Sequence, residues 1–89
     1  MILTEAERNA IEELLSVLKT EEDANKVQNA VFEVAKKQNL QPASFFKTLY
    51  LILVGAPQGP RLGPYILAMG KRNVTNALQR ALKQNTTQD

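Results

Sequence analysis

The sequence predicts an all-α protein, a compact bundle of about five helices in a single domain that covers residues 1–89. Three observations carry this prediction. Apolar residues recur at helical spacing along most of the chain, glycine and proline fall between these periodic segments, and no strand signal survives. Residues 49–54 (LYLILV) could pass as a buried strand, but Phe45 and Phe46 extend the run to helix length without a turn. Because the connections are short, successive helices must turn back on one another.

The first two helices are marked by their N-terminal signals. Thr4 and Glu7 have the spacing of a capping box, so the first helix should begin near Glu5. Thr20 is the expected N-cap of the second helix, because three acidic residues follow it where the helix dipole favours negative charge. The expected buried positions are Ile11, Leu14, Leu15 and Leu18 in the first helix, and Val27, Ala30, Val31 and Val34 in the second.

A third helix is predicted over residues 43–54, with Pro42 in its first turn and Gly55 as its left-handed terminator. Because this helix is apolar nearly all round, we expect it to be the central one, covered on several sides. Residues 57–63 should form a loop. Pro64 disfavours helix at Gly63, so the fourth helix is predicted over residues 64–69.

The fifth helix is expected after Gly70, over residues 71–84, with residues 85–89 fraying. Its apolar face comprises Val74, Ala77, Leu78, Ala81 and Leu82. Polar and basic residues share the other face: Arg72, Asn76, Gln79, Arg80 and Lys83.

Composition argues against catalysis. The chain has no cysteine and no histidine, so it lacks thiolate chemistry, the usual zinc sites and the commonest general base. The neighbouring acids Glu12 and Glu13 diverge by about 100° on a helix, which suits a solvated face better than an acid–base pair. We therefore expect no enzyme activity, no metal and no cofactor. The longest strongly apolar run, residues 49–54, is too short for a membrane span, and a cytoplasmic protein is expected.

Residues 55–72, GAPQGPRLGPYILAMGKR, contain all four glycines and three of the four prolines. The glycine spacing fits neither of the common nucleotide-binding loops, and the segment follows a helix rather than a strand. We expect these residues to end helices and to let backbones approach closely. The expected turn-shaping residues are Gly55, Gly59, Pro60, Gly63, Pro64 and Gly70. This interpretation does not by itself explain Gln58 and Arg61.

The charge is distributed unevenly along the chain. Residues 1–35 carry eight acids and three bases, a net charge of −5, whereas residues 36–89 carry eight bases and one acid, a net charge of +7. One interpretation is that the second half faces an anionic partner, of which nucleic acid is the commonest. The alternative is that acidic helices pack beside basic ones and neutralise them.

Candidate RNA-binding residues lie in the same half. They are Lys47, Tyr50, Gln58, Arg61, Lys71 and Arg72. Arginine can pair bidentately with a phosphate or a base edge, and tyrosine can stack on an unpaired base. The two tyrosines and four of the bases also have a purely structural interpretation. Tyr50 and Tyr65 could pack at the core or its boundary, and Lys71, Arg72, Arg80 and Lys83 could serve solubility.

The segment FFKTLYLILVGAPQGPRLGPYILAMGKRNVTNAL, which starts at Phe45, resembles the C-terminal end of class I lysyl-tRNA synthetases. The first shared features are a helix that carries an aromatic residue and the pair Leu-Tyr, a glycine after that helix, and a turn like Gly59–Gly63 (GPRLG). A short helix follows, which ends in an apolar residue and a glycine. The last helix then begins with basic residues. A looser version of this pattern closes bacterial glutamyl-tRNA synthetases. The resemblance covers residues 45 to about 82 and is sharpest at GPRLG.

The resemblance implies an α-helical anticodon-binding domain that holds the anticodon loop of lysine tRNA. It makes Arg61 the first candidate for contact with RNA, or else for capping the C-terminal carbonyls of a neighbouring helix. Lys47, Lys71 and Arg72 would then attract phosphates. The nucleotide-binding fold and the ATP-handling motifs of a synthetase are absent, so we expect no activation of lysine.

The chain is accordingly expected to be either a synthetase fragment or a free-standing product, with a synthetase catalytic domain or a second copy as further partners. The competing hypothesis is a helical protein-interaction module or dimer that has lost RNA binding.

Overall fold

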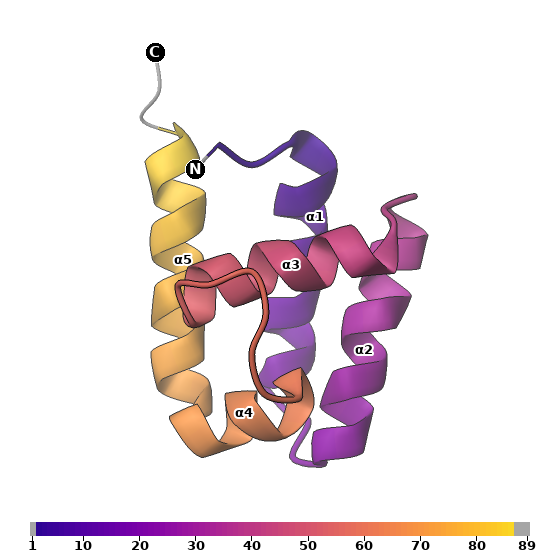
Figure 1. Ribbon diagram of the computed structural model, residues 1–89, viewed down its shortest axis with the longest axis vertical. Helices are drawn as coiled ribbons and strands as arrows, with labels where there is room; N and C mark the ends of the chain where they lie inside the picture. The colour runs from indigo at the N-terminus through magenta and orange to yellow at the C-terminus, as the bar shows by residue number, and fades with distance from the viewer. Residues whose placement is uncertain (1, 87–89) are drawn as a thin grey trace.

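Within residues 2–86, which the computed structural model describes (side chains for 2–84), the chain forms five α-helices and no strand (Figure 1). They are α1 (Glu5–Leu18), α2 (Ala24–Lys37), α3 (Pro42–Leu53), α4 (Leu62–Met69) and α5 (Lys71–Thr86). The all-α prediction is confirmed. α5 continues two residues beyond its predicted end, so fraying from residue 85 is wrong for residues 85 and 86, and residues 87–89 lie outside the described residues.

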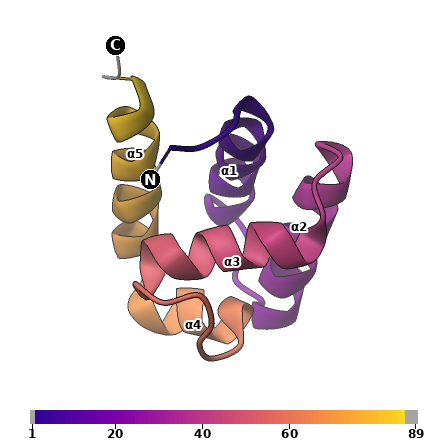
Figure 2. The same cartoon turned by 45° about the horizontal axis from the view of Figure 1, so that its top comes forward.

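The helices form two sets that cross each other. Helices α1, α2 and α5 run side by side along the long direction of the molecule, and α3 and α4 lie across them (Figures 1 and 2). Helix α4 bridges the ends of α2 and α5, with which it packs, and α3 packs on the same two helices farther along. A hydrogen bond of 3.0 Å from the Thr48 hydroxyl to Glu7 Oε2 ties α3 to α1.

The capping box predicted for α1 is present. Thr4 Oγ1 accepts a hydrogen bond from the Glu7 amide at 3.1 Å, and Glu7 Oε1 accepts one from the Thr4 amide at 2.8 Å. These two bonds satisfy N–H groups that a helix start leaves without a partner.

The predicted start of the second helix is wrong by three residues. Asp23, not Thr20, is the N-cap of α2, and its Oδ1 accepts from the Asn25 and Lys26 amides at 2.8 and 3.1 Å. The Thr20 amide instead donates to Val17 O at 3.2 Å, so Thr20 belongs to the end of α1. Of several polar residues in a row, the cap is the one whose side chain reaches the free amides once the turn has closed.

Among the described side chains, sixteen apolar ones are buried, and they form one core between the two sets of helices. They are Leu3, Ala10, Ile11, Leu14, Leu18, Val27, Val31, Val34, Ala35, Phe45, Leu49, Leu53, Leu62, Ile66, Val74 and Leu78. Of the positions predicted to be buried, Leu15, Ala30, Ala77, Ala81 and Leu82 are only partly so, and they pack at its edge. No described helix combines the length and the apolar character that crossing a membrane requires.

The prediction that the third helix is covered on several sides is wrong. In α3 only the stripe of Phe45, Leu49 and Leu53 is buried. Leu51 and Val54 remain 37% and 36% exposed. The helix lies across the outside of the bundle, so its second apolar stripe has no helix to pack against (Figure 2).

Candidate nucleic-acid interface

The loop from Val54 to Arg61 joins α3 to α4 and is held against the outer face of α3 (Figure 1). The Tyr50 hydroxyl donates a hydrogen bond of 2.7 Å to Pro60 O, which pins the end of the loop to the helix. Gly59 lies against the tyrosine ring. A Cβ built at this glycine would be 3.4 Å from Tyr50 Cδ1. The loop begins at Gly55, whose φ of 85° is in the left-handed region that ends helices. Tyr50 therefore supports the loop with its hydroxyl and with the ring beside Gly59.

Helix α4 begins two residues before its predicted start, because its first turn packs directly on α2. Gly63 is buried, and a Cβ there would overlap the Ala24 carbonyl oxygen and lie 3.0 Å from the Gln28 amide nitrogen. The Gly63 amide donates to Gln28 Oε1 at 2.6 Å. A side chain of α2 thus caps α4, a partner that Pro64 and the local sequence could not reveal.

Arg61 is exposed at the N-cap position of α4. Its Nη1 donates to Asn25 Oδ1 at 3.0 Å. Since an amide oxygen carries no net charge, this bond orients the guanidinium and leaves its charge uncompensated. Arg61 therefore presents a fixed, charged group beside the loop, and Gln58 is exposed three residues earlier.

Lys71, by contrast, has partners within the protein. Its Nζ lies 3.0 Å from Glu22 Oε2 and donates to Glu21 O at 3.2 Å, and its side chain is only 25% exposed. These contacts tie the start of α5 to the connection between α1 and α2. The neighbouring Arg72 is exposed and has no ionic partner among the described residues.

The contrast between Lys71 and Arg72 leads to a testable prediction. Lys71→Gln should lower the free energy of unfolding by about 0.5–1 kcal/mol, because it removes a partly exposed ion pair and a carbonyl contact. Arg72→Gln, the matched control, should leave stability unchanged within about 0.5 kcal/mol. Urea unfolding followed by circular dichroism measures both. Equal midpoints for the two variants would show that the Lys71 ion pair contributes nothing.

Packing neutralises only part of the uneven charge. Lys37 lies 3.4 Å from Glu13 of α1, and Lys71 lies 3.0 Å from Glu22 in the connection between α1 and α2, so acidic segments neutralise these two bases. Lys36 lies 4.0 Å from Glu33 of its own helix. Three other bases, Lys47, Arg72 and Arg80, are exposed with no acidic partner among the described residues. In the second half of the chain, the exposed bases without an acidic partner among the described residues therefore lie on α3, the loop and α5.

Four of the six candidates lie on α3 and on the loop that Tyr50 holds against it, a region that we call the loop face: Lys47, Tyr50, Gln58 and Arg61. Lys47 and Tyr50 are three residues apart, and so lie on the same side of α3. Lys71 and Arg72 lie at the far end of α4, which at eight residues is about 12 Å long.

Sequence reasoning missed an aromatic pair on α2 and α3. Phe32 and Phe46 contact each other with ring centroids 4.8 Å apart at 58°, and Phe32 is 39% exposed. Phe46 lies one turn before Tyr50 on α3, so the pair extends the loop face. The sequence did contain a signal that Phe32 points away from the core. It directly follows the buried Val31 and is rotated about 100° away from it on the helix.

No group of three or more aspartate, glutamate, cysteine or histidine residues in the described part of the chain could hold a metal ion. What the loop face offers is a guanidinium, an ammonium group, an amide and aromatic rings.

Comparison with known protein families gives one match to a family model. The family model of the anticodon binding domain matches residues 1–82. The chain belongs to this family. The match also covers α1 and α2, for which the sequence motifs alone gave no assignment.

Relatives of this anticodon-binding domain carry the name lysine–tRNA ligase. One from Cenarchaeum symbiosum (strain A) is 34% identical over 77 residues, which is 86% of this chain and 14% of the relative. One from Borreliella burgdorferi is 39% identical over 75 residues, 78% of this chain and 14% of the relative. One from Methanopyrus kandleri is 34% identical over 84 residues, 91% of this chain and 15% of the relative.

The resemblance to lysyl-tRNA synthetases is thereby confirmed. The chain spans only about one seventh of the length of these relatives. No solved structure gave a significant match.

Proposed function

We propose that this domain binds tRNA in the cytoplasm by holding the unpaired bases of an anticodon loop, that the tRNA is a lysine tRNA, and that the domain performs no reaction itself. Membership of the anticodon binding domain family and the similarity to lysine–tRNA ligases support the proposal. The relatives are about seven times longer, so a synthetase catalytic domain is the proposed partner that would supply the chemistry.

The observation that carries the proposal is the exposed Arg61 guanidinium, oriented by Asn25 and left with its full charge beside the loop. Unpaired bases are recognised by hydrogen bonds to their edges and by stacking on aromatic or guanidinium planes. Arg61 can do both, and the Gln58 amide can donate and accept at a base edge. Phe32 and Phe46 add a stacking surface on the same side of the domain.

In this proposal, the exposed cations without an acidic partner attract the phosphates of the RNA. Lys47 lies next to the aromatic pair on α3, and Arg72 lies at the start of α5. Lys71 has a smaller role in this proposal than its sequence position suggests, because Glu22 already neutralises it. Tyr50 acts indirectly, by fixing the loop that carries Gln58 and Arg61.

A titration tests the proposal. The chain is mixed with fluorescently labelled hairpins that carry the lysine anticodon or an altered anticodon, at about 50 mM and about 200 mM salt. Each lost base contact should cost about 1–3 kcal/mol, so the altered hairpin should bind at least about fivefold more weakly at both salt concentrations. Binding to both hairpins should weaken at the higher salt. Equal affinity for the two hairpins would overturn anticodon recognition. Absence of binding together with a dimer in solution would favour a protein-interaction module.

A further inference from the structure

The backbone around Arg61 is anchored on both sides. Before it, Pro60 O accepts a hydrogen bond of 2.7 Å from the Tyr50 hydroxyl of α3. After it, the Gly63 amide donates a hydrogen bond of 2.6 Å to Gln28 Oε1 of α2. The place of Arg61 in the fold is therefore set from two directions, and its long side chain is the part that still has rotational freedom.

The guanidinium at the end of that side chain has one hydrogen-bond partner among the described residues. Its Nη1 donates to Asn25 Oδ1 at 3.0 Å. Asn25 is itself held in place, because it lies in the first turn of α2 and its amide donates to the N-cap Asp23 at 2.8 Å. An arginine side chain has many rotamers, so a bond to a fixed acceptor selects one orientation of the guanidinium plane.

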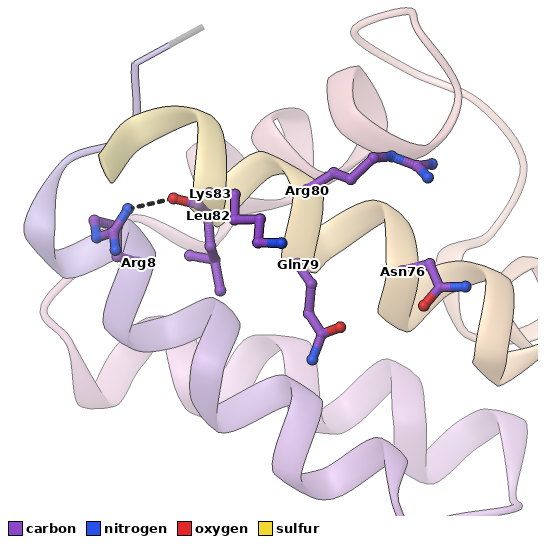
Figure 3. Close-up of a pocket in the computed structure, with 6 residues that line it drawn as sticks. All are labelled: Arg8, Asn76, Gln79, Arg80, Leu82 and Lys83. Atoms are coloured by element: carbon purple, nitrogen blue, oxygen red, sulfur yellow. Dashed lines mark hydrogen bonds between the residues drawn. The ribbon is translucent and has the colours of Figure 1, made fainter. Parts of the chain in front are cut away.

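Arg61 is both exposed and held in one geometry, unlike Arg8 and Arg80. Arg8 is oriented by a bond of 3.0 Å to Leu82 O, but it is part-buried between α1 and α5 (Figure 3). Arg80 is exposed and extends along the edge of α5 without an ionic partner among the described residues. A group that is oriented before binding loses less conformational entropy when its ligand arrives. A planar donor held in one orientation also adds geometric specificity to its contacts.

The chemistry of Asn25 matters as much as its position. Its amide oxygen accepts one N–H of the guanidinium and leaves the charge and the other N–H groups available. An aspartate in its place would also accept the bond, but the carboxylate would pair with the guanidinium and offset its charge. An alanine would leave the charge and remove the acceptor. Substitutions at this one position can therefore separate orientation from charge.

We infer that Asn25 is the positioning residue that sets discrimination between anticodons, and that it acts through Arg61 without contacting the RNA. The inference rests on the proposed function, because it concerns how the anticodon site distinguishes one base from another. Affinity then depends mainly on the charge of the guanidinium, and selectivity depends on the bond from α2 that orients it.

The test measures the Kd of the full chain and its variants for the lysine-anticodon hairpin and the altered hairpin, by fluorescence anisotropy at about 50 mM salt. Asn25→Ala should bind the lysine hairpin about three- to tenfold more weakly and the altered hairpin almost unchanged, because a matched hydrogen bond is lost only with the former. Asn25→Asp should keep the ratio of the two affinities and weaken both about two- to fivefold, because its charge offsets that of Arg61.

Asn29→Ala is the matched control. Asn29 is exposed on α2 one turn after Asn25, and it lines a groove that α2 forms with the end of α1. Its replacement should leave both affinities unchanged. In the Arg61→Ala background, Asn25→Ala should have no further effect, since a positioning residue does nothing once the group that it positions is gone. The altered side chains are exposed, so every variant should keep its helical circular dichroism signal.

The outcomes distinguish failure of the inference from failure of the proposed function. Full discrimination in Asn25→Ala, or an equal loss of discrimination in Asn29→Ala, would overturn the inference and leave the proposed function in place. A further loss when Asn25→Ala is added to Arg61→Ala would show direct contact with the RNA and overturn the positioning role. Equal affinity of the unaltered chain for the two hairpins would remove the proposed function, and the inference with it.

Discussion

Gly63→Ala should lower the free energy of unfolding by about 2–3 kcal/mol, the cost of forcing an extra methyl group into a packed contact. The new Cβ would overlap the Ala24 carbonyl oxygen and press on the Gln28 amide. Both are backbone atoms of α2, so no side-chain rotation can relieve the overlap. For a domain of this size the melting temperature should fall by roughly 10–20 °C, measurable by thermal denaturation.

Gly55→Ala is the matched control for this prediction. Gly55 has a φ of 85°, and nothing lies within 4 Å of a Cβ built there. Only backbone strain should therefore act, at about 1–2 kcal/mol. A loss at Gly63 smaller than the loss at Gly55 would contradict the close approach of α4 to α2.

Arg61→Ala should weaken binding of the lysine-anticodon hairpin by about 10- to 100-fold, because a charge-assisted contact of about 1.5–3 kcal/mol is lost. Its stability should change by less than about 0.5 kcal/mol, since the side chain is exposed and makes a single hydrogen bond to Asn25. Fluorescence anisotropy and a melting curve on the same preparation measure the two quantities.

Arg61→Lys separates charge from geometry. It keeps the positive charge and loses the planar, bidentate donor, so overall affinity should partly recover while discrimination between anticodons does not. A lower melting temperature with unchanged RNA binding in Arg61→Ala would instead make this arginine a structural residue of the α2–α4 contact.

Local signals were sufficient for most of the fold. The Thr4–Glu7 capping box marked the start of α1, and Gly55 and Gly70, both with positive φ, marked the ends of α3 and α4. These features depend on residues a few positions apart, so they can be predicted without knowing what packs nearby. The starts of α2 and α4 were wrong because Asp23 competed with Thr20, and because Gln28 caps α4 from another helix.

The candidate site was predictable in residue type but not in arrangement. The sequence pointed to Arg61, Gln58, Lys47 and Tyr50, and the structure places them on α3 and on the loop held against it. It could not show that Glu22 neutralises Lys71, because the two are 49 residues apart in the chain. Nor did it place Phe32 against Phe46.

The sequence by itself determined that this protein is helical, where its helices turn, and which family it resembles, because periodicity, caps and glycines act over one or two turns. Only the tertiary structure decided which charges reach solvent and which apolar stripe of α3 stays uncovered. Those outcomes depend on which helix lies opposite each side chain. Packing of distant segments sets that, and no local pattern records it.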